Sequence, residues 1–154
     1  MPDLDGFFVG DAKNRLAEDA AAEVGTRLMP ANTVLLSCAG SLGKVAITTR
    51  PVYSNQQFYG LVPNSEILQY IFLAIQLKMF GEAYYFSIAG MSTLGFFSKE
   101  KALDIKIILP PISLQQEFAG VVRRVESLRT RMSEADRQVD ALFESLLAES
   151  FTSC

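Results

Sequence analysis

A glycine-lysine segment is the first part of the chain whose residue types suggest chemistry. Residues 37–48 read SCAGSLGKVAIT, with a lysine directly after the second of two glycines. A phosphate-binding loop needs four residues between its glycines, and a Ser or Thr after the lysine to hold magnesium. Only two residues separate Gly40 from Gly43, and Val45 stands at the hydroxyl position. The spacing therefore disfavours a nucleotide-binding loop and favours a turn between two strands, because glycines supply the positive φ that hairpin connections require.

Other catalytic arrangements are equally poor in this chain. Histidine is absent, which removes the commonest general base and metal ligand as well as any Ser–His or Cys–His pair. Asp104 precedes Lys106 as in half of a nuclease site, but a single carboxylate cannot hold a catalytic metal. Cys38 and Cys154 have neither the spacing of a metal site nor that of a disulfide framework. We therefore expect a protein that is not an enzyme and that needs no cofactor or metal.

Composition limits the class of protein further. The chain has 154 residues, 49% of them apolar, and a net charge of −3. This length suits one domain with an appended element, and the charge argues against a strongly cationic nucleic-acid binder. No secretory segment is recognisable near the start. The most lipid-like segment, 70–90, is interrupted by Gln76, Lys78 and Glu82 and cannot span a bilayer. We expect a soluble cytoplasmic protein.

The elements that would position these residues are short and mixed. Alternating and β-branched runs bounded by turn signals predict strands, and helical spacing between caps predicts helices. Residues 1–10 look frayed. We predict helices over 14–24, from Ser65 to about Met79 and after Ser98, and strands over 33–38, 45–49, 57–62, 84–88 and 105–109. The predicted fold class is α+β, a small mixed α/β domain with short strands.

After the two prolines at 110–111 the pattern becomes that of a long helix. Ser113 and Gln116 have the spacing of a capping box, and apolar residues then follow at alternating gaps of four and three, an unbroken heptad register. The seam would be about 48 Å long at 1.5 Å per residue, too long for a small body to cover. We therefore predict a domain over 1–111 and a coiled-coil helix over 112–151, whose interface after Leu114 consists of Phe118, Val121, Val125, Leu128, Met132, Ala135, Val139, Leu142 and Leu146.

Charges along this helix indicate the direction of its partner. Its first half is rich in arginine and its second half in Asp and Glu. A parallel partner in register would set like charges together, whereas an antiparallel partner sets each basic half beside an acidic half. The charge pattern favours an antiparallel homodimer.

These features together resemble half of a specificity subunit from a type I restriction–modification system. The resemblance covers about residues 14–151, and the chain departs from the family in two ways. A stretch that family recognition domains usually have ahead of the alanine-rich helix is absent, so we expect the N-terminal part to be missing, and there is one domain and one helix where the full subunit has two of each. The resemblance rests on Gly40-Ser41-Leu42-Gly43-Lys44-Val45-Ala46-Ile47, Ser54-Asn55-Gln56-Gln57, Gly90-Met91-Ser92-Thr93, Ser98-Lys99-Glu100-Lys101-Ala102-Leu103 and Ile107-Ile108-Leu109-Pro110-Pro111-Ile112-Ser113-Leu114-Gln115-Gln116.

The resemblance implies a non-catalytic subunit that reads double-stranded DNA. Its implied partners are methyltransferase subunits, a restriction nuclease-translocase subunit and a second copy of the chain, which together would act on a palindromic site in two halves. Small residues allow close approach to DNA, lysines can bind phosphate, and amides can pair with adenine edges. The candidate DNA-binding residues are Ser41, Lys44, Asn55, Gln56, Gln57, Ser92, Thr93, Lys99 and Lys101.

An alternative remains open at this point. The acidic net charge and the absent stretch also suit a degenerate domain that no longer reads DNA and only dimerises or binds methyltransferase subunits. Each candidate residue also has a purely structural interpretation. A lysine at a turn can simply be solvated, and an amide side chain can simply hydrogen-bond the carbonyls of its own turn. Binding of duplex DNA by the purified chain would separate the two interpretations.

Overall fold

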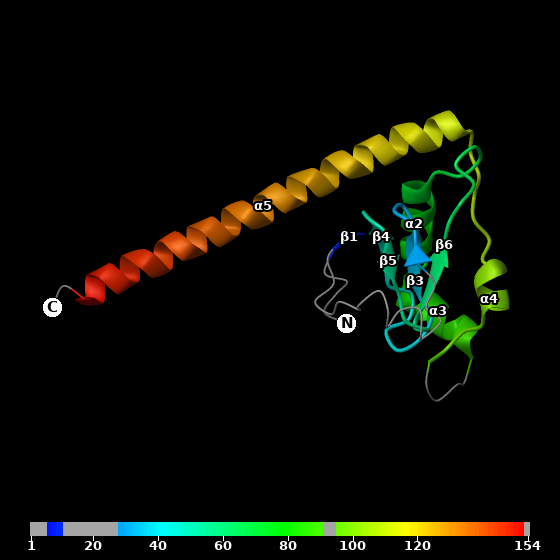
Figure 1. Cartoon of the computed structure of the whole chain (residues 1–154), viewed down its shortest axis with the longest axis horizontal. Coiled ribbons are helices and arrows are strands. Elements are labelled where there is room, and N and C mark those ends of the chain that lie inside the picture. The colour runs from blue at the N-terminus through cyan, green and yellow to red at the C-terminus, as the bar shows by residue number, and fades with distance from the viewer. Residues whose placement is uncertain (1–5, 11–27, 91–94, 153–154) are drawn as a thin grey trace. The chain divides into compact units, whose positions relative to one another are not determined.

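The computed structural model describes residues 6–10, 28–90 and 95–152, and side chains through Phe151 (Figure 1). It has two compact units, Met1–Ala119 and Gly120–Cys154. The helix predicted over 14–24 lies outside the described residues, as do Ser92 and Thr93. The elements are β1 (Phe8–Val9), β2 (Leu28–Met29), β3 (Val34–Ser37), β4 (Val45–Thr48), β5 (Val52–Tyr53), β6 (Phe58–Leu61), α2 (Tyr70–Met79), α3 (Gly81–Ala89), α4 (Lys99–Leu103) and α5 (Ile112–Thr152).

A four-stranded sheet forms the centre of the first unit. Its strand order is β1-β4-β3-β6, and β2 pairs with β5 in a separate two-stranded sheet. β3 runs antiparallel to both β4 and β6, with Leu35 opposite Ala46 on one side and Gly60 on the other. The predicted hairpin and the predicted strand within 57–62 are thus confirmed, as is the α+β class. β1 pairs parallel to β4, so the expectation that residues 1–10 are frayed is wrong for Phe8 and Val9.

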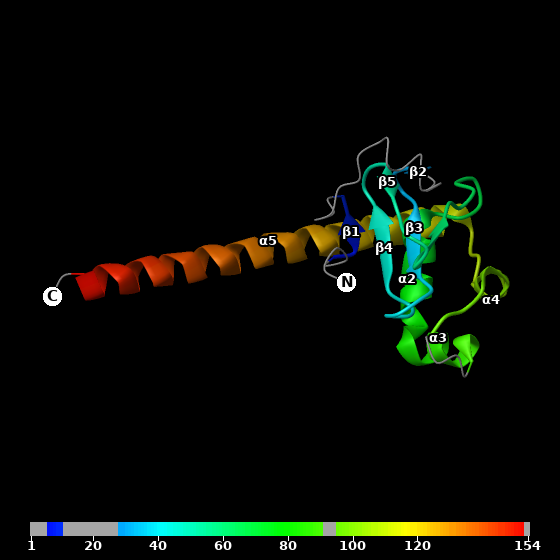
Figure 2. The same cartoon turned by 60° about the horizontal axis from the view of Figure 1, so that its bottom comes forward.

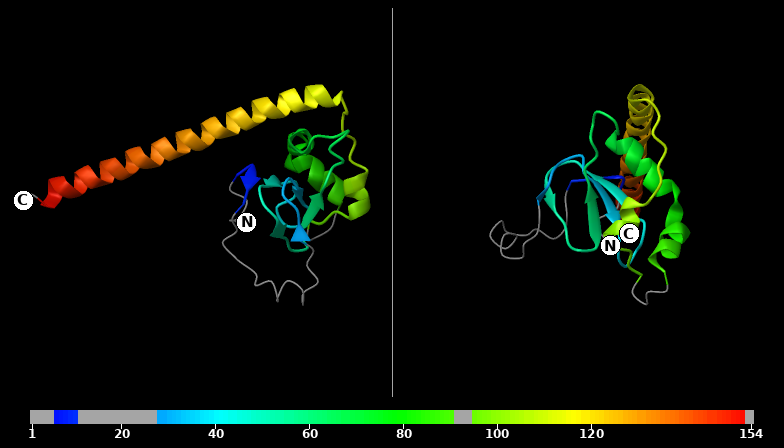
Figure 3. Two further views of the ribbon diagram at one scale, coloured as in Figure 1. Left: turned by 45° about the horizontal axis from the view of Figure 1, so that its top comes forward. Right: turned by 90° about the vertical axis from the view of Figure 1, so that its right-hand side faces the viewer.

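The core lies on both faces of β3, since every residue of this strand is buried. α2 covers one face and contacts β3 and β4 (Figures 1 and 3). On β6, Gly60 lets Met29 of β2 approach closely, because a Cβ at this glycine would lie 2.5 Å from the Met29 sulfur. The apolar residues of both strands of the hairpin thus become a buried centre.

α2 begins later than predicted. Its N-cap is Gln69 and not the predicted Ser65. The Gln69 side chain accepts a hydrogen bond from Phe72 N at 2.9 Å. Residues 64–68 form a separate turn, in which the Asn64 side chain accepts from Glu66 N. The backbone N–H of Gln69 does not take part in this turn, because it donates to the side-chain oxygen of Gln115 at 2.9 Å. The helix end near Met79 is confirmed.

The strand predicted over 84–88 is wrong, because this segment lies within helix α3. Gly81 ends α2 with a positive φ of 73°, but the chain resumes a helix at once, and Phe80 is the C-cap of one helix and the N-cap of the next. The buried residues Tyr85 and Ala89 are four apart and share one face. Helical spacing of buried residues therefore outweighs the strand preference of a run of aromatic residues.

The strand predicted over 105–109 is also wrong. Ile105 is buried, but the backbone of Ile108 bonds to a side chain and not to a strand. The Gln76 carboxamide accepts from Ile108 N at 2.8 Å and donates to Ile108 O at 3.0 Å. One glutamine of α2 thus replaces the neighbouring strand that this extended segment would need. The short helix after Ser98 is confirmed as α4, with the Ser98 side chain accepting from Lys101 N.

Helix α5 runs without interruption from Ile112 to Thr152, as Figures 1 and 2 show. Ser113 lies in its first turn, so the predicted capping box is wrong. The Pro111 carbonyl accepts from Leu114 N and Gln115 N and starts the helix. Residues 112–119 belong to the first unit, where Ala119 is buried and the Phe118 ring meets Phe72 edge to face with centroids 5.7 Å apart.

Candidate functional site

The turn between β3 and β4 carries two of the candidate DNA-binding residues. Gly40 and Gly43 both have φ of 74°, the conformation for which glycine is favoured. Two backbone amides of this turn are used internally: Leu42 N donates to Gly40 O at 3.1 Å, and Gly43 N donates to Ser37 O at 3.0 Å. These two amides are therefore already engaged and do not point at a phosphate. This geometry agrees with the rejection of a nucleotide loop on spacing.

The tip of this turn is packed into the body on its inner side. Leu42 is buried, and a Cβ at Gly43 would lie 2.0 Å from Cδ2 of Tyr85. Tyr85 itself is fully buried, stacks on Phe97 with ring centroids 5.7 Å apart, and donates to Leu77 O at 2.7 Å. The aromatic side chain of α3 therefore fixes the tip. Its outer side presents the half-buried Ser41 and the exposed Lys44.

The second candidate segment, 55–57, lies beside the base of the same turn. Gln57 O accepts from Cys38 N at 2.8 Å, and Gln56 O accepts from the Cys38 thiol at 3.5 Å. The Asn55 side chain accepts from Gln57 N at 3.1 Å and donates to Gln57 Oε1 at 3.4 Å. All three amide side chains are exposed. Two of them support their own turn, and within the described residues no side-chain hydrogen bond engages the third, Gln56.

The third segment, 96–101, meets the other two at Cys38. Phe97 N donates to Cys38 O at 3.2 Å, and Phe97 O accepts from the Tyr59 hydroxyl at 2.9 Å. Lys99 and Lys101 follow on α4 and are exposed. The Lys101 ammonium donates to Ile88 O near the end of α3. The structure thus brings Ser41, Lys44, 55–57 and the start of α4 to one end of the sheet, while Ser92 and Thr93 lie outside the described residues.

The centre of this surface is uncharged. Burial raises the pKa of the Cys38 thiol above its usual value. Burial also raises the pKa of Tyr59 to about 12, and the neighbouring Cys38 adds to this shift. Both groups are therefore neutral near pH 7 and serve as structural hydrogen-bonding partners. Within the described residues, no three His, Cys, Asp or Glu side chains gather where they could hold a metal ion.

Charge at the rim of this surface is mixed. Lys44, Lys99 and Lys101 supply cations, and α4 also carries Glu100. A hydrogen bond from Ser98 lowers the pKa of Glu100, which keeps this carboxylate ionised. A surface of this kind attracts phosphate only weakly by charge. Affinity for DNA would therefore depend on the number of such surfaces that act together.

Sequence reasoning missed the residue that holds the start of α5. The Gln115 side chain is fully buried. Its oxygen accepts from Gln69 N at 2.9 Å, and its nitrogen donates to Ile67 O at 3.0 Å and to Pro110 O at 2.7 Å. The signal available in the sequence was a glutamine four residues after the second of the two prolines, Pro111. The capping role that the sequence predicts for the neighbouring Gln116 is wrong, and its side chain is exposed.

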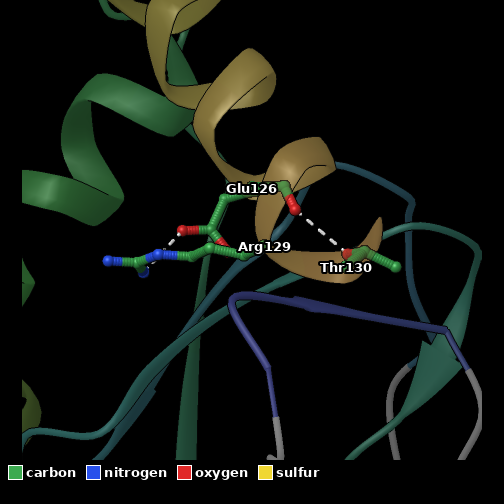
Figure 4. A network of polar contacts seen from close by, with 3 residues as sticks. All are labelled: Glu126, Arg129 and Thr130. Carbon is green, nitrogen blue, oxygen red and sulfur yellow. Dashed lines mark hydrogen bonds and ion pairs between the residues drawn. The ribbon is translucent and has the colours of Figure 1, made fainter. Parts of the chain in front are cut away.

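The second unit continues α5 from Gly120 and carries most of the predicted interface. The seam residues are all exposed, although the Phe118 ring also meets Phe72; they are Phe118, Val121, Val125, Leu128, Met132, Ala135, Val139, Leu142 and Leu146. Polar contacts within the helix lie on other faces. Arg129 pairs with Glu126 at 3.0 Å, and the Thr130 hydroxyl donates to Glu126 O at 3.0 Å (Figure 4). Such exposed pairs add little stability, so the apolar stripe is the dominant feature of this unit.

The fold and the exposed surface together define a class of protein. Its members have an α+β body with short strands, followed by a long helix with an exposed heptad stripe. None of the helices in the described ranges is long and apolar enough to cross a bilayer. Residues 7–138 match the family described as the type I restriction modification DNA specificity domain, and the chain belongs to this family.

The chain is also similar to a named relative, the type I restriction enzyme MjaIX specificity subunit of Methanocaldococcus jannaschii. The two are 25% identical over 146 residues, which are 94% of this chain and 33% of the relative. The chain therefore spans about a third of the length of that relative. The resemblance read from the sequence is confirmed at the level of the family.

Proposed function

We propose that the chain is the DNA-reading subunit of a type I restriction–modification complex and acts as a homodimer on a palindromic site in two halves. Family membership supports recognition of DNA. The observation that carries the homodimer is the exposed heptad stripe of α5, since large apolar stripes on soluble proteins mark interaction surfaces. In this proposal the subunit is not catalytic, acts in the cytoplasm, and methyltransferase subunits dock on the paired helices and modify adenine. A nuclease-translocase subunit joins for cleavage.

The energetics favour a dimer that needs more than the stripe alone. Burying a Val, Leu or Met side chain yields about 1.5–3 kcal/mol. About eight seam residues then contribute on the order of 15 kcal/mol per helix, against an association cost of about 4–15 kcal/mol. The opposite charge of the two halves of α5 favours the antiparallel arrangement. Two copies in this arrangement carry two recognition surfaces separated by a helical spacer.

The spacer sets the expected distance between the half-sites. A seam of about 48 Å corresponds to roughly 14 base pairs at 3.4 Å each. Each lobe would approach DNA with the sheet end that carries Lys44, Gln56 and Lys99. The exposed Gln56 amide is the best candidate for pairing with an adenine edge, and Lys44 suits a phosphate, because within the described residues neither side chain has a hydrogen-bond partner in the body.

Dimerisation is tested by two substitutions in the stripe. Leu128→Asp combined with Val139→Asp puts a charge into two seam layers of each copy, and we expect a monomer in sedimentation or light scattering. The matched control is Ser127→Asp with Ala141→Asp, which adds the same charge to exposed positions outside the seam. A doubly substituted seam variant that stays dimeric would refute the assignment of the stripe.

DNA reading is tested by a titration of duplex DNA with the purified chain at several salt concentrations. We expect Lys44→Glu to weaken binding for all sequences and to reduce the salt dependence by about one phosphate contact, while the dimer mass is unchanged. Lys106→Glu makes the same charge change at another exposed lysine and should have less effect. Equal effects of both variants would remove the hairpin tip from the interface.

A second candidate function is a module that only dimerises and binds methyltransferase subunits. The net charge of −3 and the mixed charge around α4 favour it. Under this alternative the chain assembles with methyltransferase subunits, shows no salt-dependent binding of duplex DNA, and tolerates Lys44→Glu without any change in modification. The DNA titration therefore separates the two functions.

A further inference from the structure

Phe96 is an exposed aromatic residue on the candidate DNA surface. Its side chain is 46% exposed, whereas that of Phe97, the next residue, is 1% exposed. Successive side chains of an extended segment point to opposite faces, so Phe97 fills the core and Phe96 faces outward. The Phe97 ring packs against Tyr59 and Tyr85. Within the described residues no ring contact engages Phe96, so its outer part is available to a ligand.

The backbone that carries this ring is fixed. Phe96 lies opposite Ala39 in an isolated antiparallel bridge. Directly after it, Phe97 N donates to Cys38 O at 3.2 Å, and Phe97 O accepts from the Tyr59 hydroxyl at 2.9 Å. A side chain that reads a base must be held in place by its surroundings. These contacts supply that support for Phe96.

An amide and a cation lie at the same junction as the ring. Cys38 is bonded to a second segment as well, because its N–H donates to Gln57 O at 2.8 Å and its thiol donates to Gln56 O at 3.5 Å. Both the Gln56 segment and the Phe96 segment are therefore held at one residue. The exposed Lys99 follows three residues after Phe96. The ring is thus accompanied by an amide suited to a base edge and a cation suited to a phosphate.

A single half-exposed ring in these surroundings suits a base edge better than a protein. Protein interfaces bury about 800 Å² on each partner around an apolar centre, and the polar residues Ser98, Lys99 and Glu100 next to this ring do not supply one. In the major groove, thymine presents a C5-methyl group that apolar side chains such as Phe contact. Because about half of the Phe96 ring is covered by the body, it suits contact with a base edge more than insertion between base pairs.

Resting on the proposed DNA-reading function, we propose that Phe96 is a specificity-determining residue that contacts the methyl group of a thymine in each half-site. Cytosine lacks this methyl group, so the ring discriminates against a G·C pair at that position. Gln56, at the same junction, suits an adenine edge. The two side chains together favour a half-site that contains A·T pairs.

Replacement of single thymines by uracil tests this contact, because uracil pairs like thymine and lacks only the methyl group. The probe is a duplex with the methylated motif found when the chain is expressed with a type I methyltransferase subunit, and the protein is the chain assembled with that subunit. We expect one thymine position at which uracil in one half-site raises the dissociation constant about fourfold, as loss of a buried methyl group predicts. Uracil in both half-sites should raise it about tenfold or more.

Two variants assign this effect to Phe96. With Phe96→Ala, thymine and uracil at the sensitive position should bind equally. The matched control is Leu28→Ala, because Leu28 is 52% exposed but lies on β2 in the separate two-stranded sheet. This control should keep the full preference for thymine. Tyrosine fluorescence during urea unfolding verifies that both variants fold.

The outcomes separate this inference from the proposed function. Sensitivity to uracil at one position that disappears with Phe96→Ala supports the contact. A half-site without A·T pairs, no position sensitive to uracil, or sensitivity that persists in Phe96→Ala overturns the contact and leaves DNA reading standing. Loss of assembly with the methyltransferase subunit in Phe96→Ala assigns the ring to a protein interface and also overturns the contact. Absence of any motif and of any duplex binding overturns the proposed function and this inference with it.

Discussion

Replacing the buried Gln115 should destabilise the body of the protein far more than its side-chain volume suggests. Gln115→Met keeps a side chain of similar length but removes the carboxamide. Three backbone groups then lose their partner, namely the Gln69 N–H and the carbonyls of Ile67 and Pro110. Each buried polar group left without a partner costs about 1–3 kcal/mol. Allowing for water at the less buried carbonyls, we expect a loss of about 3 kcal/mol in the free energy of unfolding.

The assay follows from where the tyrosines lie. All five occur between residues 53 and 85, so tyrosine fluorescence during urea unfolding reports on the first unit alone. Protein concentration is held constant, because association shifts apparent stability. Gln116→Met is the matched control, since it makes the same chemical change at the exposed neighbouring position.

The result that would refute this reasoning is equally specific. If Gln115→Met unfolds within about 0.5 kcal/mol of Gln116→Met, the three hydrogen bonds do not hold the start of α5. In heat, the expected loss corresponds to a fall in Tm of roughly 10 °C.

Three further predictions concern the surface around Cys38 and its supports. Gly43→Ala should lower the free energy of unfolding of the body by about 2 kcal/mol or more, because it forces a side chain into positive φ and against the Tyr85 ring. Gly40→Ala should cost less, because Gly40 has the same φ but open space around it. Equal losses in the two variants would contradict the packing argument. The pKa of Tyr59 rises from about 10 in the unfolded chain to about 12 in the fold, so the contribution of its neutral hydroxyl to the free energy of unfolding should be fully present below pH 10 and be lost as pH rises through 12. In urea unfolding, Tyr59→Phe should lose less stability over this range than the unsubstituted protein. Identical pH profiles of the two proteins would contradict this assignment. Gln76→Leu should raise hydrogen exchange at Ile108 N, whose partner is the Gln76 oxygen, and unchanged protection would show that another group holds this segment.

The β3–β4 hairpin and helix α5 could be predicted because their signals are local. In the hairpin, β-branched and apolar runs flank glycines whose positive φ the turn requires. In α5, a heptad register repeats over many turns without proline. Each signal is complete within its own segment, so no knowledge of the rest of the chain was needed.

The errors arose where distant residues decide local structure. The segment 105–109 reads as a strand, but its backbone partner is Gln76, thirty-two residues before Ile108. The aromatic run at 84–88 favours a strand by propensity, but the burial of Tyr85 against Gly43 and Phe97 selects a helix. The helix predicted from Ser65 begins at Tyr70, because the backbone N–H of Gln69 bonds to the Gln115 side chain and not to the preceding turn. Long-range polar contacts of this kind leave no periodic signal.

The candidate DNA surface was predictable as a set of segments but not as a geometry. Glycine, amide and lysine types singled out the turn at 38–44, the segment 55–57 and the start of α4. Their meeting at Cys38 depends on backbone hydrogen bonds across the sheet end. The sequence also could not indicate that Lys101 caps α3 through Ile88 O, which leaves Lys44 and Lys99 as the stronger candidates for phosphate.

The most direct test of the proposed function is a methylation map of the genome in cells that express this chain with a type I methyltransferase subunit. The proposal predicts a new methylated adenine motif that is palindromic, lies in two halves, and disappears with Leu128→Asp combined with Val139→Asp. Assembly of the complex without any new motif would contradict DNA reading by this chain, and a motif that is not palindromic would contradict the homodimer.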